Sequence, residues 1–220
     1  MKLIYHNTYQ IISILYSTMS IKNDVTICFD TTGSMQRCIA AVRKNVGEIV
    51  TKLFNEIPDI HISIVGLGDY CDGPNLMLSV DLCNDVNKIV KFIKEVPNTG
   101  GGDMPEAYEY ALREVQNFAW RPDAKRSLVM IGDSNPHELG SPENIFKIDW
   151  KKEVEKLKDM NVTIYSIQAL TGEGGAAYYF YDDMAEMTGG LHLFLYNFED
   201  ISNILIDICM GKTDLDKYML

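Results

Sequence analysis

Residues 24–34 read Asp-Val-Thr-Ile-Cys-Phe-Asp-Thr-Thr-Gly-Ser, and this stretch decides the fold. The apolar run Val25–Phe29 predicts a short buried strand that ends at Asp30. From Gln36 to Ile57 the apolar residues recur at helical spacing, and Pro58 ends the pattern. Those apolar positions are Ile39, Val42, Val46, Ile49, Val50, Leu53 and Phe54. A buried strand, a polar turn and an amphipathic helix form the first unit of a parallel sheet.

The rest of the chain repeats this alternation. Strands are predicted at 60–67, 127–131, 162–169 and 191–195, with a short edge strand at 76–82. Helices are predicted at 85–96, from about 103 to 120, at 150–160, 178–187 and 198–209. Short apolar strands alternating with helices are typical of a sheet covered on both faces. We therefore expect an α/β fold, a doubly wound and mostly parallel sheet flanked by helices.

The composition narrows the class of protein. The 220 residues suit one domain at 23–210, with an N-terminal extension at 1–22 and a C-terminal tail at 211–220. Acidic residues outnumber basic ones by 31 to 20, which argues against nucleic acid and anionic membranes as partners. Five scattered cysteines without a CxxC pair favour reduced thiols and a cytoplasmic location. Secretion is the alternative if residues 1–20 are a signal peptide, and no run has the length of a transmembrane segment.

Three polar loops are expected at the carboxyl ends of the strands, where sites form in such folds. They are Asp30-Thr-Thr-Gly-Ser34, Thr99-Gly-Gly-Gly-Asp103 and Gly132-Asp133-Ser134. Their side chains offer carboxylates and hydroxyls and no His or Cys, which is the ligand chemistry of a hard cation. We expect Mg²⁺ or Mn²⁺, with Asp30, Thr32 and Ser34 pointing inward together.

The first loop resembles the D-x-S/T-x-S signature of von Willebrand factor type A domains, and the other two loops follow in that family's order. The segment 99–106 is similar to the type A domains of hemicentins and of proteins with alpha-type kinases. The resemblance covers about residues 24–210 and implies a Rossmann-like fold with a metal-ion-dependent adhesion site. It implies that Thr32 and Ser34 contact the ion, and that Asp30 and Asp133 bind it directly or through water. Asp103 stands where many members carry Thr, and Thr99 is the alternative ligand from that loop.

The resemblance implies a non-enzymatic module that binds a protein partner, whose acidic side chain would complete the metal shell. An aspartate at position 103 would make the ion less electrophilic and weaken that capture. The alternative is a haloacid-dehalogenase-like phosphotransferase, because Asp30-Thr-Thr-Gly-Ser34 also resembles a D-K-T-G-T phosphorylation loop with Asp30 as nucleophile. Such an enzyme needs a lysine near the site, and Lys125 is poorly placed for that role.

Three further segments have two interpretations each, and a fourth has an expected role in switching. Asp103 and Glu106 form a capping-box pattern, which is compatible with metal binding. Asp69 and Asp72 suit a solvated loop better than a second metal site. The cluster Tyr178–Tyr181 is expected to pack within a helix, with an exposed partner surface as the alternative. By analogy with type A domains, the helix at 198–209 is expected to slide when the metal site changes state.

Overall fold

The chain folds around one six-stranded sheet of order β3-β2-β1-β4-β5-β6, in which only β3 runs antiparallel to its neighbour. The computed structural model describes residues 22–102, 104–170, 176–212 and 215–219. The strands are β1 Lys22–Asp30, β2 Ile60–Leu67, β3 Met77–Cys83, β4 Ala124–Gly132, β5 Val162–Ala169 and β6 His192–Leu195. The α/β fold with a mostly parallel sheet is thus confirmed.

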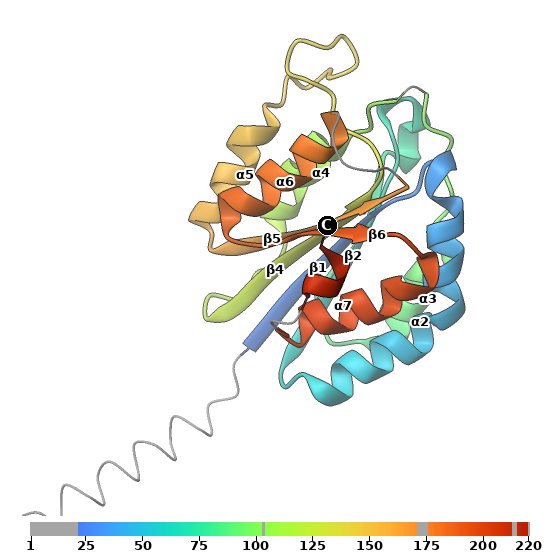
Figure 1. Cartoon of the computed structure of the whole chain (residues 1–220), viewed down its shortest axis with the longest axis vertical. Coiled ribbons are helices and arrows are strands. Elements are labelled where there is room, and N and C mark those ends of the chain that lie inside the picture. Colours follow the sequence, from blue (N-terminus) through green and yellow to red (C-terminus); the bar gives the residue numbers. More distant parts are fainter. Residues whose placement is uncertain (1–21, 103, 171–175, 213–214, 220) are drawn as a thin grey trace, which may run out of the picture.

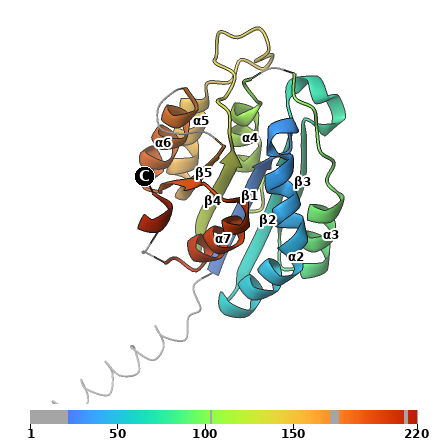
Figure 2. The same ribbon diagram turned by 45° about the vertical axis from the view of Figure 1, so that its right-hand side comes forward.

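The helices form a layer on each face of the sheet (Figure 1). One layer contains α2 Gln36–Glu56, α3 Val86–Glu95 and α7 Ile201–Cys209, and the other contains α4 Tyr108–Glu114, α5 Trp150–Asp159 and α6 Ala176–Thr188. Figure 2 shows the sheet between the two layers. Each layer buries its own hydrophobic cluster, because the central strands carry apolar side chains on both faces.

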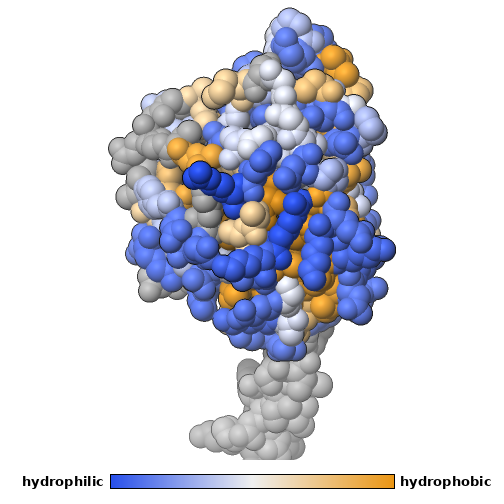
Figure 3. Space-filling model, turned by 90° about the vertical axis from the view of Figure 1, so that its right-hand side faces the viewer, coloured by the Kyte–Doolittle hydropathy of each residue, from blue (hydrophilic) through white to orange (hydrophobic). Residues whose placement is uncertain are grey.

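The predicted helix Gln36–Ile57 is confirmed as α2, and its sequence explains its position. Its apolar stripe faces the sheet, with Val46, Ile49 and Leu53 almost fully buried. The face on the right of Figure 1, along which α2 runs, is mainly hydrophilic, with apolar atoms showing between charged side chains (Figure 3). Among the described residues, no helix is long and apolar enough to cross a membrane.

The strand register aligns three carboxyl ends at one edge of the sheet. Asp30 at the end of β1 lies opposite Leu67 of β2, and Phe29 lies opposite Ile131 of β4. From β1 the chain continues toward β2 on one side, while β4 lies on the other, so the strand order reverses here. In α/β sheets this reversal opens a crevice between the loops that follow the two strands.

The structure differs from the sequence prediction around Glu106. The helix expected from about 103 to 120 begins only at Tyr108, and α4 ends at Glu114 before a 3₁₀ turn at Val115–Asn117 (η3). Glu106 precedes the helix and forms a β-bridge with Pro136, its backbone N–H donating to Asn135 at 3.0 Å. The cap position is Ala107, so the capping box with Glu106 as its acid is wrong. Asp103, the other half of that prediction, lies outside the described residues.

The last predicted helix begins as a 3₁₀ turn, Phe198–Asp200 (η4), and becomes α-helical at Ile201. The C-terminal segment ends in a 3₁₀ turn at Asp216–Tyr218 (η5), and Leu215 before it is buried. The N-terminal extension predicted at 1–22 falls outside the described residues up to position 21.

Candidate functional site

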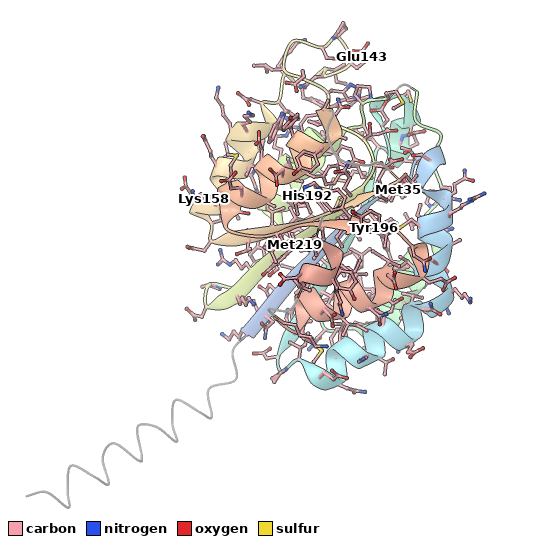
Figure 4. All side chains as sticks on the ribbon, viewed as in Figure 1. Met35, Glu143, Lys158, His192, Tyr196 and Met219 are labelled. Atoms are coloured by element: carbon pink, nitrogen blue, oxygen red, sulfur yellow. The ribbon has the colours of Figure 1, made fainter. Side chains whose placement is uncertain are left out.

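Two of the three predicted loops are joined by their backbones. The N–H of Thr31 donates to the carbonyl of Leu67 at 2.7 Å, and the N–H of Thr99 donates to the carbonyl of Thr31 at 2.9 Å. These bonds extend the β1–β2 pairing past the strand ends and seat the glycine-rich segment beside the turn after β1. Figure 4 labels Met35, next to Ser34, where the chain enters α2 at this edge of the sheet.

Asp30 is fully buried and both of its carboxylate oxygens accept hydrogen bonds. Oδ1 accepts from the backbone N–H of Thr32 at 2.7 Å and from its hydroxyl at 2.6 Å, and Oδ2 accepts from the hydroxyl of Tyr108 at 2.6 Å. Burial raises the pKa of Asp30 to about 6, although these hydrogen bonds act in the opposite direction. Asp30 therefore fixes the positions of Thr32 and Tyr108.

The contact between Tyr108 and Asp30 requires a glycine at the end of β4. A Cβ atom on Gly132 would lie 2.0 Å from the Tyr108 hydroxyl oxygen and 2.5 Å from that of Tyr181. Both tyrosines are fully buried, so neither can swing aside without disturbing the core. Gly132 thus leaves room for the Tyr108 hydroxyl to reach Asp30.

Ser34 and Asp133 form a second hydroxyl–carboxylate pair at the mouth. Ser34 is exposed, Asp133 is half-buried, and the Ser34 hydroxyl donates to the Asp133 carboxylate. Burial raises the pKa of Asp133, and the hydrogen bond from Ser34 partly offsets that rise. The loops after β1 and β4, about 100 residues apart in sequence, lie close together here, and the charge of Asp133 also acts on Asp30.

The described part of the glycine-rich segment contributes a buried threonine hydroxyl. The hydroxyl of Thr99 lies 2.9 Å from that of Thr31, which itself donates to the carbonyl of Leu67 at 2.8 Å. Thr99 therefore stabilises the loop junction through a buried side chain. Asp103, the first-choice ligand from this segment, lies outside the described residues.

Glu106 is the functional candidate that sequence reasoning missed. Its side chain is only 5% exposed and its carboxylate is within hydrogen-bond reach of Thr32. Among the described residues its Oε2 has no hydrogen-bond partner. Burial, followed by repulsion from Asp30 and other nearby carboxylates, raises the pKa of Glu106 to about 9. The hydrogen bond with Thr32 acts in the opposite direction but does not offset this rise.

A partly buried network of polar side chains holds the glycine-rich segment. Asp72 accepts from the N–H groups of Gly100 at 3.1 Å and Gly101 at 3.4 Å. Asp72 also accepts from the N–H of Asp69, whose own carboxylate lies 2.7 Å from His137 Nε2. The expectation that Asp69 lies in a solvated loop is wrong, because it is 3% exposed under the segment that follows β4.

The donor set fits a hard divalent cation. Within the described ranges, no group of three or more His, Cys, Asp and Glu side chains is placed to hold a metal ion, so a site here would depend on hydroxyl oxygens too. Thr32 and Ser34 each direct their proton to a carboxylate, which leaves hydroxyl lone pairs free. The unpartnered Oε2 of Glu106 adds a third unsatisfied oxygen. Oxygen-only donors with partial negative charge suit Mg²⁺ or Mn²⁺.

Comparisons with known proteins identify the family of the chain. The family model described as von Willebrand factor type A domain matches residues 24–208. The chain is 25% identical over 188 residues to a protein of Acanthamoeba polyphaga mimivirus that carries the name ariadne-like RING finger protein R811. It is 24% identical over 116 residues to the alpha-protein kinase vwkA of Dictyostelium discoideum. These matches cover 78% and 52% of this chain but only 18% and 19% of the two relatives.

Solved structures show the same fold. Two structures of the pilus adhesin SpaC from Lactobacillus rhamnosus GG superpose with TM-scores of 0.62 and 0.63. Each superposition covers 88% of this chain and about 30% of the adhesin, at 12% and 16% sequence identity.

Proposed function

Because the chain belongs to the von Willebrand factor type A family, as the match over residues 24–208 establishes, we propose that it is a non-enzymatic module that binds a protein partner through a divalent cation. Domains of this family typically serve protein interactions and adhesion and are usually non-catalytic. The cation is Mg²⁺ or Mn²⁺. The hydroxyls of Thr32 and Ser34 hold it, with Asp133 and Glu106 as carboxylates around it and Asp30 acting directly or through water.

One observation carries this proposal above the others. Glu106 is a buried acid with one oxygen unpartnered among the described residues, and it lies close to the Thr32 hydroxyl and to the carboxylates of Asp30, Asp69 and Asp72. Removing an unpaired carboxylate from water is costly, so a cation at this position would stabilise the fold as well as the loops. The cation would also supply a positive centre that an oxygen ligand of the partner can reach past the exposed Ser34.

The surface around the site suits a protein partner. The segment that follows β4 projects beyond the edge of the sheet, with Glu143 near its tip (Figures 1 and 4). It exposes Ile145 and Phe146, and Met104 is exposed where its carbonyl accepts from the Ser134 hydroxyl. Exposed apolar side chains next to polar loops favour a macromolecular contact over a small-molecule pocket. The carboxylates of Asp30, Asp133 and Glu106 together carry more negative charge than one divalent cation neutralises. This excess weakens the capture of an acidic partner and favours neutral oxygen ligands.

The test is capture of partners by immobilised protein in Mg²⁺ and in EDTA. We expect Mg²⁺-dependent capture by the wild type and its loss in Ser34→Ala, which changes an exposed residue and leaves the core intact. Ser79→Ala on β3 is the matched control, because it removes an exposed hydroxyl away from the site. Capture that is equal in EDTA, or equal in both variants, would overturn the proposal.

Two observations weigh against the phosphotransferase alternative. Asp30 has both oxygens engaged by Thr32 and Tyr108, so it is poorly placed for nucleophilic attack. Lys125 pairs with Asn23, seven residues before Asp30 on β1, which is about 23 Å away at strand spacing. We expect no phosphate release from p-nitrophenyl phosphate or ATP, and turnover that disappears in Asp30→Asn would favour the enzyme instead.

A further inference from the structure

A second candidate site lies between α6 and β6, the last strand of the sheet on the side of β5. It is a groove of about 260 Å³ that shares no residue with the site at the sheet edge. The residues that matter for its chemistry are Tyr178, Asp182, Glu186, His192, Phe194 and Met219. Figure 4 labels His192 and Met219, which lie close to one another beside β6.

One wall of the groove is aromatic. The ring centroids of Tyr178 and His192 are 5.2 Å apart, and those of His192 and Phe194 are 4.4 Å apart. The rings of Tyr178 and Phe194 are nearly parallel, at 21° and 6.2 Å. The row continues to Tyr196, which is stacked on Phe194 and 68% exposed. Helix packing explains Phe180 and Tyr181, which are buried, but not this row, which extends to the surface.

The α6 side of the groove, which carries Tyr178, is also acidic. Asp182 and Glu186 are four residues apart on α6, so their side chains lie on the same helix face. Among the described residues, neither forms an ion pair with a lysine or arginine; the nearest basic group is His192, whose Nδ1 is 3.7 Å from Asp182. Burial lowers the pKa of His192, although Asp182 acts in the opposite direction, so the ring is neutral at pH 7. Within the described part of the chain, neither carboxylate therefore has a cationic side chain as its ion-pair partner.

Aromatic faces next to uncompensated carboxylates define the chemistry of the ligand. A cation over an aromatic ring is attracted by the negative charge of its face, and a guanidinium group can also bond to a carboxylate with two parallel N–H groups. Arginine combines both modes because its head is planar, and its aliphatic stem packs on apolar surface. The formal charge of −11 adds long-range attraction for a basic partner.

We propose that the groove between α6 and β6 binds an arginine side chain of a protein partner, with the guanidinium group bonded to Asp182 and Glu186 and over the Tyr178 ring, and the stem against Phe194. This site is independent of the cation at the sheet edge. A partner that carries such an arginine would contact α6 and β6 rather than the loops that hold the cation.

The test is a nuclear magnetic resonance titration of the ¹⁵N-labelled chain in EDTA, with the peptide acetyl-Gly-Arg-Gly-amide as the probe. We expect saturable shifts at the amides of residues 182–194 and at least tenfold weaker binding of acetyl-Gly-Gln-Gly-amide. Glu186→Gln should weaken arginine binding by at least fivefold. Tyr178→Leu should weaken it by about two- to fivefold, the usual size of a cation–π contribution at a surface. Glu155→Gln, an exposed acid on α5, is the matched control and should bind as the wild type does.

Three results would overturn the proposal. They are the absence of saturable shifts at 10 mM peptide, affinity unchanged in Glu186→Gln, and equal binding of a lysine peptide. Because EDTA is present throughout, failure of the metal site cannot produce any of them.

Discussion

Replacing Glu106 by Gln tests the metal site through the stability of the protein. Burial and neighbouring carboxylates raise the pKa of Glu106 from 4.5 to about 9, so at pH 7 this group is protonated in the metal-free fold and ionised in the unfolded chain. Because the pKa of Glu106 is higher in the folded than in the unfolded chain, the free energy of unfolding falls as the pH rises from 4.5 toward 9. At about 1.4 kcal/mol per pH unit, the interval from 4.5 to pH 7 makes folding less favourable by about 3 kcal/mol.

Gln is neutral in both states, so Glu106→Gln removes this penalty. In EDTA the variant should melt higher than the wild type, by at most about 6–12 °C for a domain of this size. Mg²⁺ at ten times its Kd should stabilise the wild type by about 1.4 kcal/mol, or about 3–6 °C. The variant lacks one carboxylate ligand, so its Mg²⁺ shift should be less than half as large.

The assay is differential scanning calorimetry at pH 7, in EDTA and across a Mg²⁺ series. Glu153→Gln is the matched control, because Glu153 is also buried but lies on α5, bonded to Gln116 and Lys156. Its Mg²⁺ shift should equal that of the wild type. The reasoning about Glu106 would be refuted by a metal-free variant that melts no higher than wild type and shows the full Mg²⁺ shift.

Three further substitutions test parts of the structure around the site. Gly132→Ala should destabilise the protein by about 1–3 kcal/mol in urea denaturation, because its Cβ would collide with Tyr108 and Tyr181. Gly47 is an exposed residue of α2 with nothing near the position of a Cβ, so Gly47→Ala should be neutral or stabilising. A similar loss of stability in both glycine variants would contradict this account. Although burial acts to raise it, the hydrogen bond and charge of His137 hold the pKa of Asp69 below its ordinary 3.8. Ionised Asp69 thus adds stability above about pH 4 that is lost as the pH falls through its lower folded pKa, and Asp69→Asn should flatten the acid limb of the stability profile. An acid limb that Asp69→Asn leaves unchanged would argue against this pair. Ile204→Ala in α7 should cost about 2–5 kcal/mol, since Ile204 is fully buried. If α7 is a switch, the variant will also change partner affinity per folded molecule without removing Mg²⁺ binding, whereas a purely structural role predicts only the stability loss.

Much of the fold could be predicted because the strands are buried on both faces. Val25–Phe29 and the run at 162–169 are apolar enough to identify strands without any knowledge of their neighbours. The residues after the strands at 25–29 and 127–131 also suggested Asp30 and Asp133 as site residues, since carboxyl ends of parallel strands meet at one edge. Thr32 and Ser34 followed from the turn between strand and helix.

The parts that could not be predicted depend on contacts between distant loops. Pro105 and Glu106 suggest a helix start, but the chain pairs here with Pro136, and only that pairing carries Glu106 to Thr32. Asp69 is buried by a segment almost 70 residues away that supplies His137. A glycine at the end of a buried strand, as at position 132, is a weak sign in the sequence that another group approaches the backbone. The sequence does not say that this group is the Tyr108 hydroxyl.

The central claim, a divalent cation held at the carboxyl edge of the sheet, is tested most directly by counting bound Mn²⁺. Electron paramagnetic resonance reports free Mn²⁺ during titration of EDTA-treated and desalted protein. We predict one bound ion per chain in the wild type and in Ser79→Ala, and a strongly weakened site in both Ser34→Ala and Asp133→Ala. No bound Mn²⁺ at millimolar concentration, or a site unchanged in both loop variants, would contradict the account.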